Sequence, residues 1–304
     1  MESILELRGL TKRYGDHVAV EGLSFAVPRG SVFGLLGPNG AGKTTTIRMV
    51  MRIILPDEGS VLLDGEPVDD ARRRLIGYLP EERGLYRKMK VLDHLVFLGT
   101  VRGLPPREAR KRSAAWLERF DLGQWADHKV EDLSKGMQQK VQFIGTILHR
   151  PRLLILDEPF SGLDPLNTRE LKDLLLAMRE EGVTIVLSTH VLPQVDELCD
   201  HICLINRARP ILVGRLDEIR ERFGGRTWEV DGAFGREALQ GLPGVAAVHE
   251  LRGRYLLDLA PGAGSRQVLA ALLELGEVTH FARFVPDLEN IFIRAVEEDQ
   301  SHAA

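Results

Sequence analysis

An eight-residue stretch, GPNGAGKT, combines glycines with a lysine and a hydroxyl side chain. Its spacing matches the pattern G-x-x-x-x-G-K-[ST], in which backbone N–H groups unshielded by side chains surround phosphate oxygens. Lys43 would reach the β- and γ-phosphates of a nucleoside triphosphate, and the Thr44 hydroxyl would ligate Mg²⁺. The stretch therefore predicts a nucleotide-binding loop made by Gly37, Pro38, Asn39, Gly40, Ala41, Gly42, Lys43, Thr44 and Thr45.

Two adjacent acids follow an apolar run in LLILDEPF. A buried strand of this kind would deliver Asp157 and Glu158 to the carboxyl edge of a parallel sheet, where ligands bind in open α/β folds. We expect Asp157 to hold Mg²⁺, directly or through water, and Glu158 to act as general base on the attacking water. A lone DEP is commonly only a polar strand end, so this prediction depends on the phosphate loop.

A third apolar run, VLSTH, predicts another buried strand with His190 just beyond its end. A histidine at that place could hydrogen-bond the γ-phosphate and hold Glu158 in position. Alone, a strand-end histidine is more often structural. With Lys43 and Glu158 beside it, His190 completes a predicted catalytic set.

These residues need a scaffold that brings them together. Three short apolar runs are typical of parallel strands covered on both faces: residues 32–36, LLILDEP and TIVLSTH. In ILELRGL and LSFAVPRG, apolar and polar residues alternate, which is typical of strands with one buried face. Apolar residues at helical spacing predict a helical insert over about 91–150. We expect an α/β domain over 1–222, a small α/β domain over 223–304, and disorder in the final residues DQSHAA.

Composition limits the possible partners. The chain has 304 residues, 44% of them hydrophobic and 28% charged, and its net charge of −4 gives no global attraction for nucleic acid. Its apolar runs are far shorter than the roughly 20 residues needed to span a bilayer. Only Cys199 and Cys203 are present, so no disulfide framework is expected. We expect a cytoplasmic protein with no nucleic-acid partner and no membrane span.

With these motifs in order, the sequence resembles the ATP-binding cassette family, the ATPase subunits of ABC transporters, over about residues 4 to 220. The order is KRYG with Tyr14, the phosphate loop (Walker A), GYLPEERGLY with Glu81, the signature LSKGMQQK with Ser134 and Gly136, the acid pair (Walker B), SGLD ending in Asp164, and His190. The resemblance implies a P-loop cassette with a mostly parallel sheet core, an antiparallel N-terminal β-subdomain and a helical insert. A small C-terminal α/β domain would follow.

The resemblance also implies roles for residues outside the phosphate loop. Ser134 and Gly136, at a helix N-terminus, would grip the γ-phosphate held by the Walker A loop of a partner chain. Tyr14 would stack on adenine, and Asp164 would lie at the nucleotide. Glu81 replaces the family's usual Gln and would touch Mg²⁺ and the attacking water. Two signature positions, Lys135 and Met137, depart from the family's Gly and Gln, so the family's contacts from these positions cannot be carried over.

For function, the resemblance implies an ATP-binding and ATP-hydrolysing subunit that dimerises and docks on a separate membrane permease at the inner face of the cell membrane. Docking would involve residues 83–90. The tail PDLENIFIRAVEE and the GYLPEERGLY loop are similar to those of the bacterial drug and sodium exporter branch, which favours export. The dimer could be of identical or related chains.

Two other functions remain as alternatives. The first is a non-transport ABC ATPase of translation or repair. A repair ATPase would insert a long coiled coil between Walker A and the signature, and a translation ATPase would typically carry two cassettes. The second is a nucleotide-gated regulatory module that no longer hydrolyses ATP. The presence of Glu158 and His190 disfavours that alternative.

Overall fold

The computed structural model describes residues 2–82, 84–251 and 253–302. It forms two compact units, one running up to Arg215 and resuming at Ala295, and the other spanning Leu216–Arg294. The expected boundary at 222/223 falls inside helix α8 (Leu216–Gly224). The end of this helix is bound within the second unit, because Arg294 Nη1 donates to the Phe223 carbonyl at 3.2 Å. The division therefore lies before α8.

The first unit is built on a six-stranded sheet with the order β10-β9-β3-β8-β7-β6. Every neighbouring pair is parallel except β9 and β10. All residues of β3, β7 and β8 are buried, as expected for apolar strands covered on both faces. The strands are β3 (Val32–Leu36), β6 (Ile76–Leu79), β7 (Leu153–Asp157), β8 (Thr184–Thr189), β9 (His201–Asn206) and β10 (Arg209–Arg215).

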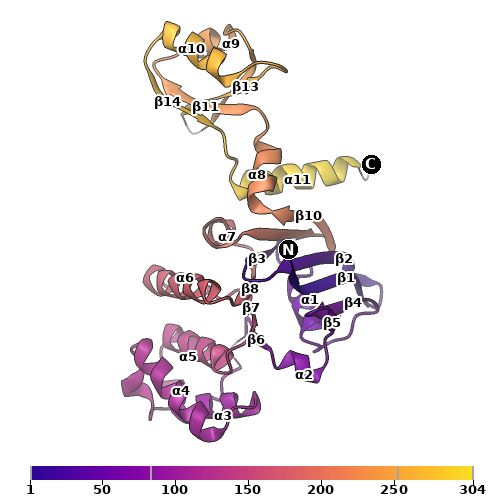
Figure 1. The fold of residues 1–304 in the computed structure, drawn as a ribbon, viewed down its shortest axis with the longest axis vertical. Helices are drawn as coiled ribbons and strands as arrows, with labels where there is room; N and C mark the ends of the chain where they lie inside the picture. The colour runs from indigo at the N-terminus through magenta and orange to yellow at the C-terminus, as the bar shows by residue number, and fades with distance from the viewer. Residues whose placement is uncertain (1, 83, 252, 303–304) are drawn as a thin grey trace. The chain divides into compact units, whose positions relative to one another are not determined.

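A second, antiparallel sheet belongs to the same unit and has the order β2-β1-β4-β5. Helix α1 (Lys43–Val50) lies between the two sheets (Figure 1), and its Ile47, Met49 and Val50 join one apolar core with residues of both. The packing of α1 between the two sheets holds its amino end close to β3, the strand that precedes it. The strands are β1 (Ser3–Tyr14), β2 (His17–Pro28), β4 (Glu58–Leu63) and β5 (Glu66–Pro67).

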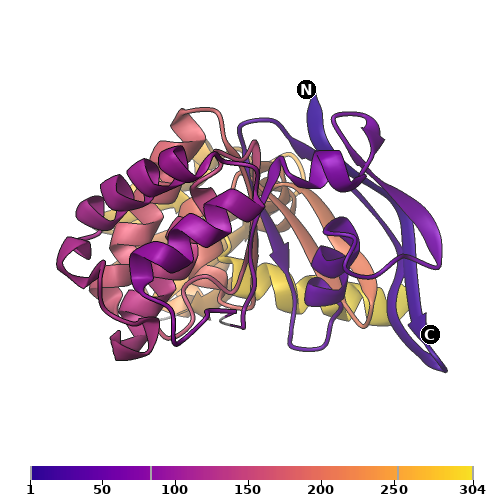
Figure 2. The same ribbon diagram turned by 90° about the horizontal axis from the view of Figure 1, so that it is seen from below.

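Helices α3 to α7 lie on the other side of the six-stranded sheet (Figures 1 and 2). An insert between β6 and β7 holds α3 (Val91–Val101), α4 (Pro106–Arg119) and α5 (Lys135–Ile147). Helices α6 (Pro165–Glu180) and α7 (Leu192–Leu198) follow β7 and β8, and the short α2 (Asp70–Arg73) precedes β6. The parallel sheet core, the antiparallel subdomain and the helical insert expected from the sequence are all confirmed.

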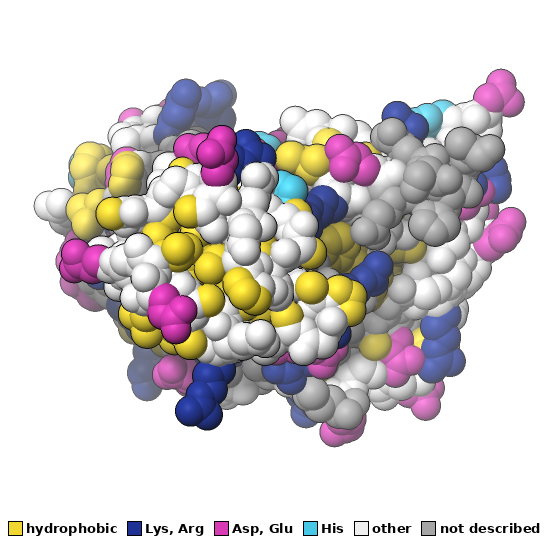
Figure 3. Space-filling view, turned by 90° about the horizontal axis from the view of Figure 1, so that it is seen from above, with side chains coloured by type: hydrophobic (Ala, Val, Ile, Leu, Met, Phe, Trp, Pro, Cys, Tyr) yellow, Lys and Arg dark blue, Asp and Glu magenta, His cyan; other side chains and the backbone are white. Residues whose placement is uncertain are grey.

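The second unit is an antiparallel sheet with helices on one face. Its strands have the order β12-β13-β11-β14. Leu239, Leu242, Val268 and Leu272, from the helical side, form its core with buried strand residues. The face of this unit that carries α9 and α10 shows hydrophobic side chains gathered in one area with charged ones around it (Figure 3). Its elements are β11 (Thr227–Gly232), α9 (Arg236–Gln240), β12 (Val245–Leu251), β13 (Arg254–Leu259), α10 (Ser265–Leu275) and β14 (Val278–Arg283).

One local expectation changes. Helix α11 (Leu288–His302) includes Asp299 to His302, so the expected disorder there is wrong, because the apolar repeat of LENIFIRAV starts a helix that continues through these polar residues. Residues 303 and 304 lie outside the described part. Within that part, no helix combines the length and apolar character needed to cross a membrane.

Candidate active site

Two glycines make the phosphate loop possible between β3 and α1. Gly37 has φ 151° and Gly42 has φ 113°, in the region that favours glycine. A Cβ on Gly37 would come within 2.2 Å of the Ile205 carbonyl oxygen, and one on Gly42 within 2.5 Å of the Ala19 carbonyl oxygen. The loop can therefore keep this path only without side chains at these positions, and it ends at the amino terminus of α1, where free N–H groups favour anions.

Lys43 is the first residue of α1 and is only 6% exposed. Its Nζ donates to the carbonyls of Gly37 at 2.7 Å and Pro38 at 3.2 Å. Burial lowers the pKa of Lys43, while the nearby carboxylates of Glu158, Asp157 and Glu81 act in the opposite direction. The ammonium group thus lies inside the loop that would surround phosphates, with one of its three N–H donors still available.

The next residue connects the loop to the acid pair. Thr44 Oγ1 donates to Asp157 Oδ2 at 3.1 Å. Asp157 is 1% exposed, and its second oxygen, Oδ1, is buried and has no hydrogen-bond partner among the described residues. Burial raises the pKa of Asp157. An unpartnered buried carboxylate oxygen beside a threonine hydroxyl is an all-oxygen donor set, which suits Mg²⁺.

Glu158 is held by three donors. Its Oε2 accepts from Thr189 Oγ1 at 3.0 Å, and its Oε1 accepts from the His190 backbone N–H at 3.1 Å. The ring nitrogen Nδ1 of His190 lies 2.7 Å from the same Oε1. Glu158 also has φ 49°, a left-handed backbone that is uncommon outside glycine and concentrates at functional sites. The carboxylate is therefore fixed in one orientation beside Asp157.

A pocket of about 460 Å³ joins the phosphate loop to both acids. Tyr14, at the end of β1 and 49% exposed, borders it, as does Glu81, which follows β6. The structure thus brings together most of the residues predicted from the sequence. His17 and Ala19 also line it and were not anticipated, because nothing in their local sequence marks a ligand. The predicted lining residues are Tyr14, Asn39, Gly40, Gly42, Lys43, Thr44, Thr45, Glu81, Asp157 and Glu158.

Ser134, Gly136 and Asp164 do not line this pocket. They border a separate pocket of about 360 Å³. Ser134 caps the amino end of α5, where its Oγ accepts from the Met137 N–H at 3.3 Å, and Asp164 caps α6 through the Asn167 N–H at 2.9 Å. The nearest atom to a Cβ built on Gly136 is Asn167 Nδ2 at 3.7 Å, so the backbone there is open. Two helix N-termini therefore face this second pocket.

Three polar residues that position the site were missed by sequence reasoning. Besides Thr189, the buried amides of Gln139 and Gln142 on α5 bind the loops that carry the acids. Gln139 Nε2 donates to the Pro159 carbonyl at 3.1 Å, and Gln142 Nε2 to the Pro80 carbonyl at 3.1 Å. Two glutamines three residues apart on one helix face were the available signal, since buried amides need partners.

A glycine loop that opens a helix after β3, an acid pair at the end of β7 in the same sheet, and a serine-capped helix in an insert define the ATP-binding cassette class of P-loop ATPases. Comparisons with known proteins agree. The family model described as "ABC transporter" matches residues 20–161, and the model described as "ATP-binding protein DrrA1-3-like, C-terminal domain" matches residues 214–296.

Similar proteins extend the match over nearly the whole chain. The ABC transporter ATP-binding protein YhaQ of Bacillus subtilis is 43% identical, over 96% of this chain and 98% of its own. Nod factor export ATP-binding protein I of Cupriavidus metallidurans is 36% identical, over 97% of each chain. A solved ATP-binding subunit of an ABC transporter is 34% identical, with a TM-score of 0.68 over 73% of this chain and 94% of that one.

The chain belongs to the ATP-binding proteins of ABC transporters. It binds ATP and hydrolyses it as the ATPase subunit of such a transporter. Neither non-transport alternative finds support among these relatives.

Proposed function

We propose that two chains of this type hold each ATP between them, with the Walker A loop of one and the signature residues Ser134 and Gly136 of the other. The observation that carries the proposal is the separation of the two pockets within one chain. Both pockets offer helix N-termini, which favour anionic groups, so a triphosphate could be bound from two sides. Loss of the γ-phosphate would weaken the dimer and let the chains part.

Within the site, Lys43 would contact the β- and γ-phosphates and Tyr14 would stack on adenine. Glu158 would take a proton from the attacking water. The contacts from Thr189 and His190 support this role, because they direct the carboxylate and leave one lone pair of its Oε2 unused. His190, whose side chain is 50% exposed, is free to turn one ring nitrogen toward a phosphate.

Thr44 and Asp157 would hold Mg²⁺, which supplies charge neutralisation at the β- and γ-phosphates. The unpartnered Oδ1 of Asp157 supports this assignment. Glu81 would add a third carboxylate at the edge of the pocket, where the family usually has a neutral Gln. A carboxylate is a strong Mg²⁺ ligand, so we expect Glu81 to strengthen divalent-ion binding.

We further propose export, at the inner face of the membrane, through a separate permease. The support comes from the Nod factor export relative, which matches over 97% of its length, and from the DrrA1-3-like C-terminal domain. Tyr86, Phe97 and Val101 support a docking surface beside the Glu81 loop, since they are 55%, 40% and 63% exposed and the Tyr86 and Phe97 rings are 5.4 Å apart. Residue 83, within the expected docking stretch, lies outside the described residues.

Complementation between two inactive variants tests the shared site. Lys43→Ala and Ser134→Arg should each lack ATPase activity alone. Mixed, they should recover part of it, because the mixed dimer pairs an intact Walker A loop with an intact signature. Calorimetry on Lys43→Ala should show lost ATP affinity, with Lys111→Ala as the control. No recovery in mixtures that size-exclusion chromatography shows to contain mixed dimers would contradict the arrangement.

Affinity purification from detergent-solubilised membranes tests the transport partner. Tagged chain should recover a polytopic membrane protein identified by mass spectrometry, and inverted vesicles holding both should concentrate cargo in an ATP-dependent manner. Export is wrong if right-side-out vesicles, supplied with internal ATP, are the ones that accumulate it.

A further inference from the structure

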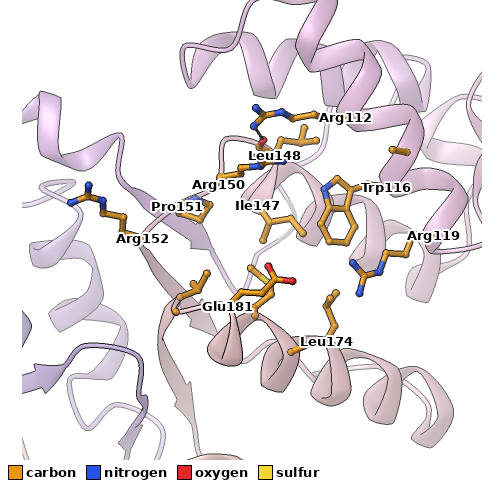
Figure 4. A pocket seen from close by; sticks show the side chains of 15 residues that line it. Arg112, Trp116, Arg119, Ile147, Leu148, Arg150, Pro151, Arg152, Leu174 and Glu181 are labelled. Carbon is orange, nitrogen blue, oxygen red and sulfur yellow. Dashed lines mark hydrogen bonds between the residues drawn. The ribbon is translucent and has the colours of Figure 1, made fainter.

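A second large pocket lies away from the nucleotide site, with a volume of about 650 Å³. Helix α4, the end of α5 with the segment that follows it, and the end of α6 form its walls (Figure 4). Trp116, Ile147 and Leu174 lie around its centre, and Met178 adds to the apolar lining. A pocket of this size with apolar walls is typical of sites for small organic ligands.

The position of the pocket separates it from the established chemistry. Its lining residues Arg152 and Val183 come directly before β7 and β8, whereas Asp157 and Thr189 end the same strands. The two sites are therefore at opposite edges of the sheet, roughly 15 Å apart along a strand. Helix α5 is shared between this pocket and the signature: its amino end carries Ser134 and Gly136, and its last residue, Ile147, lines the pocket.

Charge distinguishes this pocket from a simple apolar gap. Two of its arginines already form ion pairs: Arg112 Nε lies 2.7 Å from Glu108 Oε1, and Arg152 Nη1 lies 3.4 Å from Asp64 Oδ2. The Arg152 side chain is directed away from the pocket (Figure 4). Arg119 and Arg150 form no salt bridge with a carboxylate within the described part of the chain, although Arg150 lies near enough to Glu108 to contribute to the lowered pKa of that acid. They leave positive charge at the rim of the pocket.

Trp116 and Glu181 indicate which kind of anionic ligand the pocket could bind. The Arg119 guanidinium lies 4.9 Å from the centre of the Trp116 ring, so an anion bound to Arg119 would have an aromatic surface beside it. Glu181, which has no cationic partner among the described residues, directs its carboxylate toward the centre of the pocket (Figure 4). Two unpaired cations against one carboxylate leave a net charge of about +1.

We propose that this pocket binds an anionic amphiphile of small-molecule size. Its apolar body packs against Trp116 and Leu174, and its anionic group pairs with Arg119 and Arg150 at the rim. Glu181 opposes a purely anionic ligand and favours one that also carries a hydrogen-bond donor. The inference is independent of the dimer and of export, because it concerns walls made by one chain on the edge of the sheet away from Walker A.

Two fluorescent probes with the same apolar skeleton test the proposal on the full chain. They are 8-anilinonaphthalene-1-sulfonate and its uncharged counterpart N-phenyl-1-naphthylamine, titrated with saturating ADP present so that the phosphate loop is filled. The sulfonate should bind with a stoichiometry of one per chain and at least about tenfold more tightly than the neutral probe, because a charge-assisted pair adds about one factor of ten.

Four variants test how the charge and the shape of the pocket affect sulfonate affinity. The double change Arg119→Gln and Arg150→Gln should weaken sulfonate binding by about tenfold or more, and Glu181→Gln should strengthen it by about threefold by removing repulsion. Ala177→Trp should fill the pocket and abolish binding with all charges retained. Lys111→Gln, which removes a charge from α4 outside the pocket, should leave the affinity unchanged. Equal sulfonate affinities in the wild type, the double variant and Ala177→Trp would overturn the proposal, as would equal affinities for the two probes.

Discussion

The side-chain amide of Gln142 joins the signature helix to the loop that carries Glu81: its Nε2 donates to the Pro80 carbonyl at 3.1 Å and to the Glu82 carbonyl at 3.3 Å. Gln142 lies two turns beyond Ser134 on α5. One helix therefore carries the residue that we propose for the partner's nucleotide and also holds a loop at the chain's own nucleotide pocket. This contact gives a physical route by which the two half-sites can sense each other.

Replacement of Gln142 by Leu should lower kcat for ATP hydrolysis by about three- to tenfold, because two hydrogen bonds that position the Glu81 loop are lost. ATP affinity should change little, since the phosphate loop is untouched. Gln138→Leu is a matched control: its amide also donates to two carbonyls, those of Val130 and Leu133, but both lie within the insert. Equal effects of the two changes on kcat would argue against a role for the Glu81 loop.

Thr189→Val should reduce kcat by about tenfold while leaving the ATP affinity measured by calorimetry intact. The hydroxyl that donates to Glu158 Oε2 at 3.0 Å is lost, and the carboxylate gains freedom to turn away from the attacking water. Thr100→Val provides the control, because its hydroxyl only bonds the Val96 carbonyl within α3. If Thr189→Val hydrolyses ATP at the wild-type rate, the orientation of Glu158 does not depend on this contact.

Glu158→Gln should bind ATP but stall before hydrolysis, because an amide cannot accept the proton of the attacking water. Trapped ATP should then hold two chains together, and size-exclusion chromatography should show a dimer that depends on ATP and disperses with ADP. Glu82→Gln is the matched control one residue beyond Glu81. Steady-state turnover of Glu158→Gln near the wild-type rate would mean that another group acts as base.

His94 makes the free energy of unfolding depend on pH. Its ring is fully buried beside Tyr86, neither nitrogen has a hydrogen-bond partner among the described residues, and burial lowers the pKa of His94 from 6.5 to about 4. Below pH 6.5 the unfolded chain binds a proton that the folded chain excludes, so stability falls as the pH drops toward 4. At about pH 5 the cost is about 2 kcal/mol.

His94→Phe should remove that pH dependence. The free energy of unfolding of the variant relative to the wild type should rise by about 2 kcal/mol between about pH 7 and about pH 5, measured by denaturant titration. His128→Gln, at an exposed histidine, should show no such change. A difference between His94→Phe and the wild type that stays constant with pH would show that His94 titrates normally in the folded chain.

Much of the site could be predicted from the sequence because its chemistry is local. The phosphate loop needs glycines and a lysine in fixed order, and the apolar run before Asp157 places that acid at a strand end. The partners of Thr189, Gln139 and Gln142 could not be predicted, because they lie between 20 and 62 positions away. Their roles depend on which surfaces the helical insert presents to the sheet.

The amino-acid sequence alone determined the class of protein, the order of its elements and the residues that we propose to meet ATP, since each depends on short-range spacing and on backbone geometry. Only the tertiary structure decided that Ser134 and Lys43 open into different pockets, and that arginines from α4 and from the turn after α5 border an apolar cavity. Packing of helices against a sheet joins residues that are distant along the chain, and that packing depends on the summed burial of many side chains rather than on any one motif.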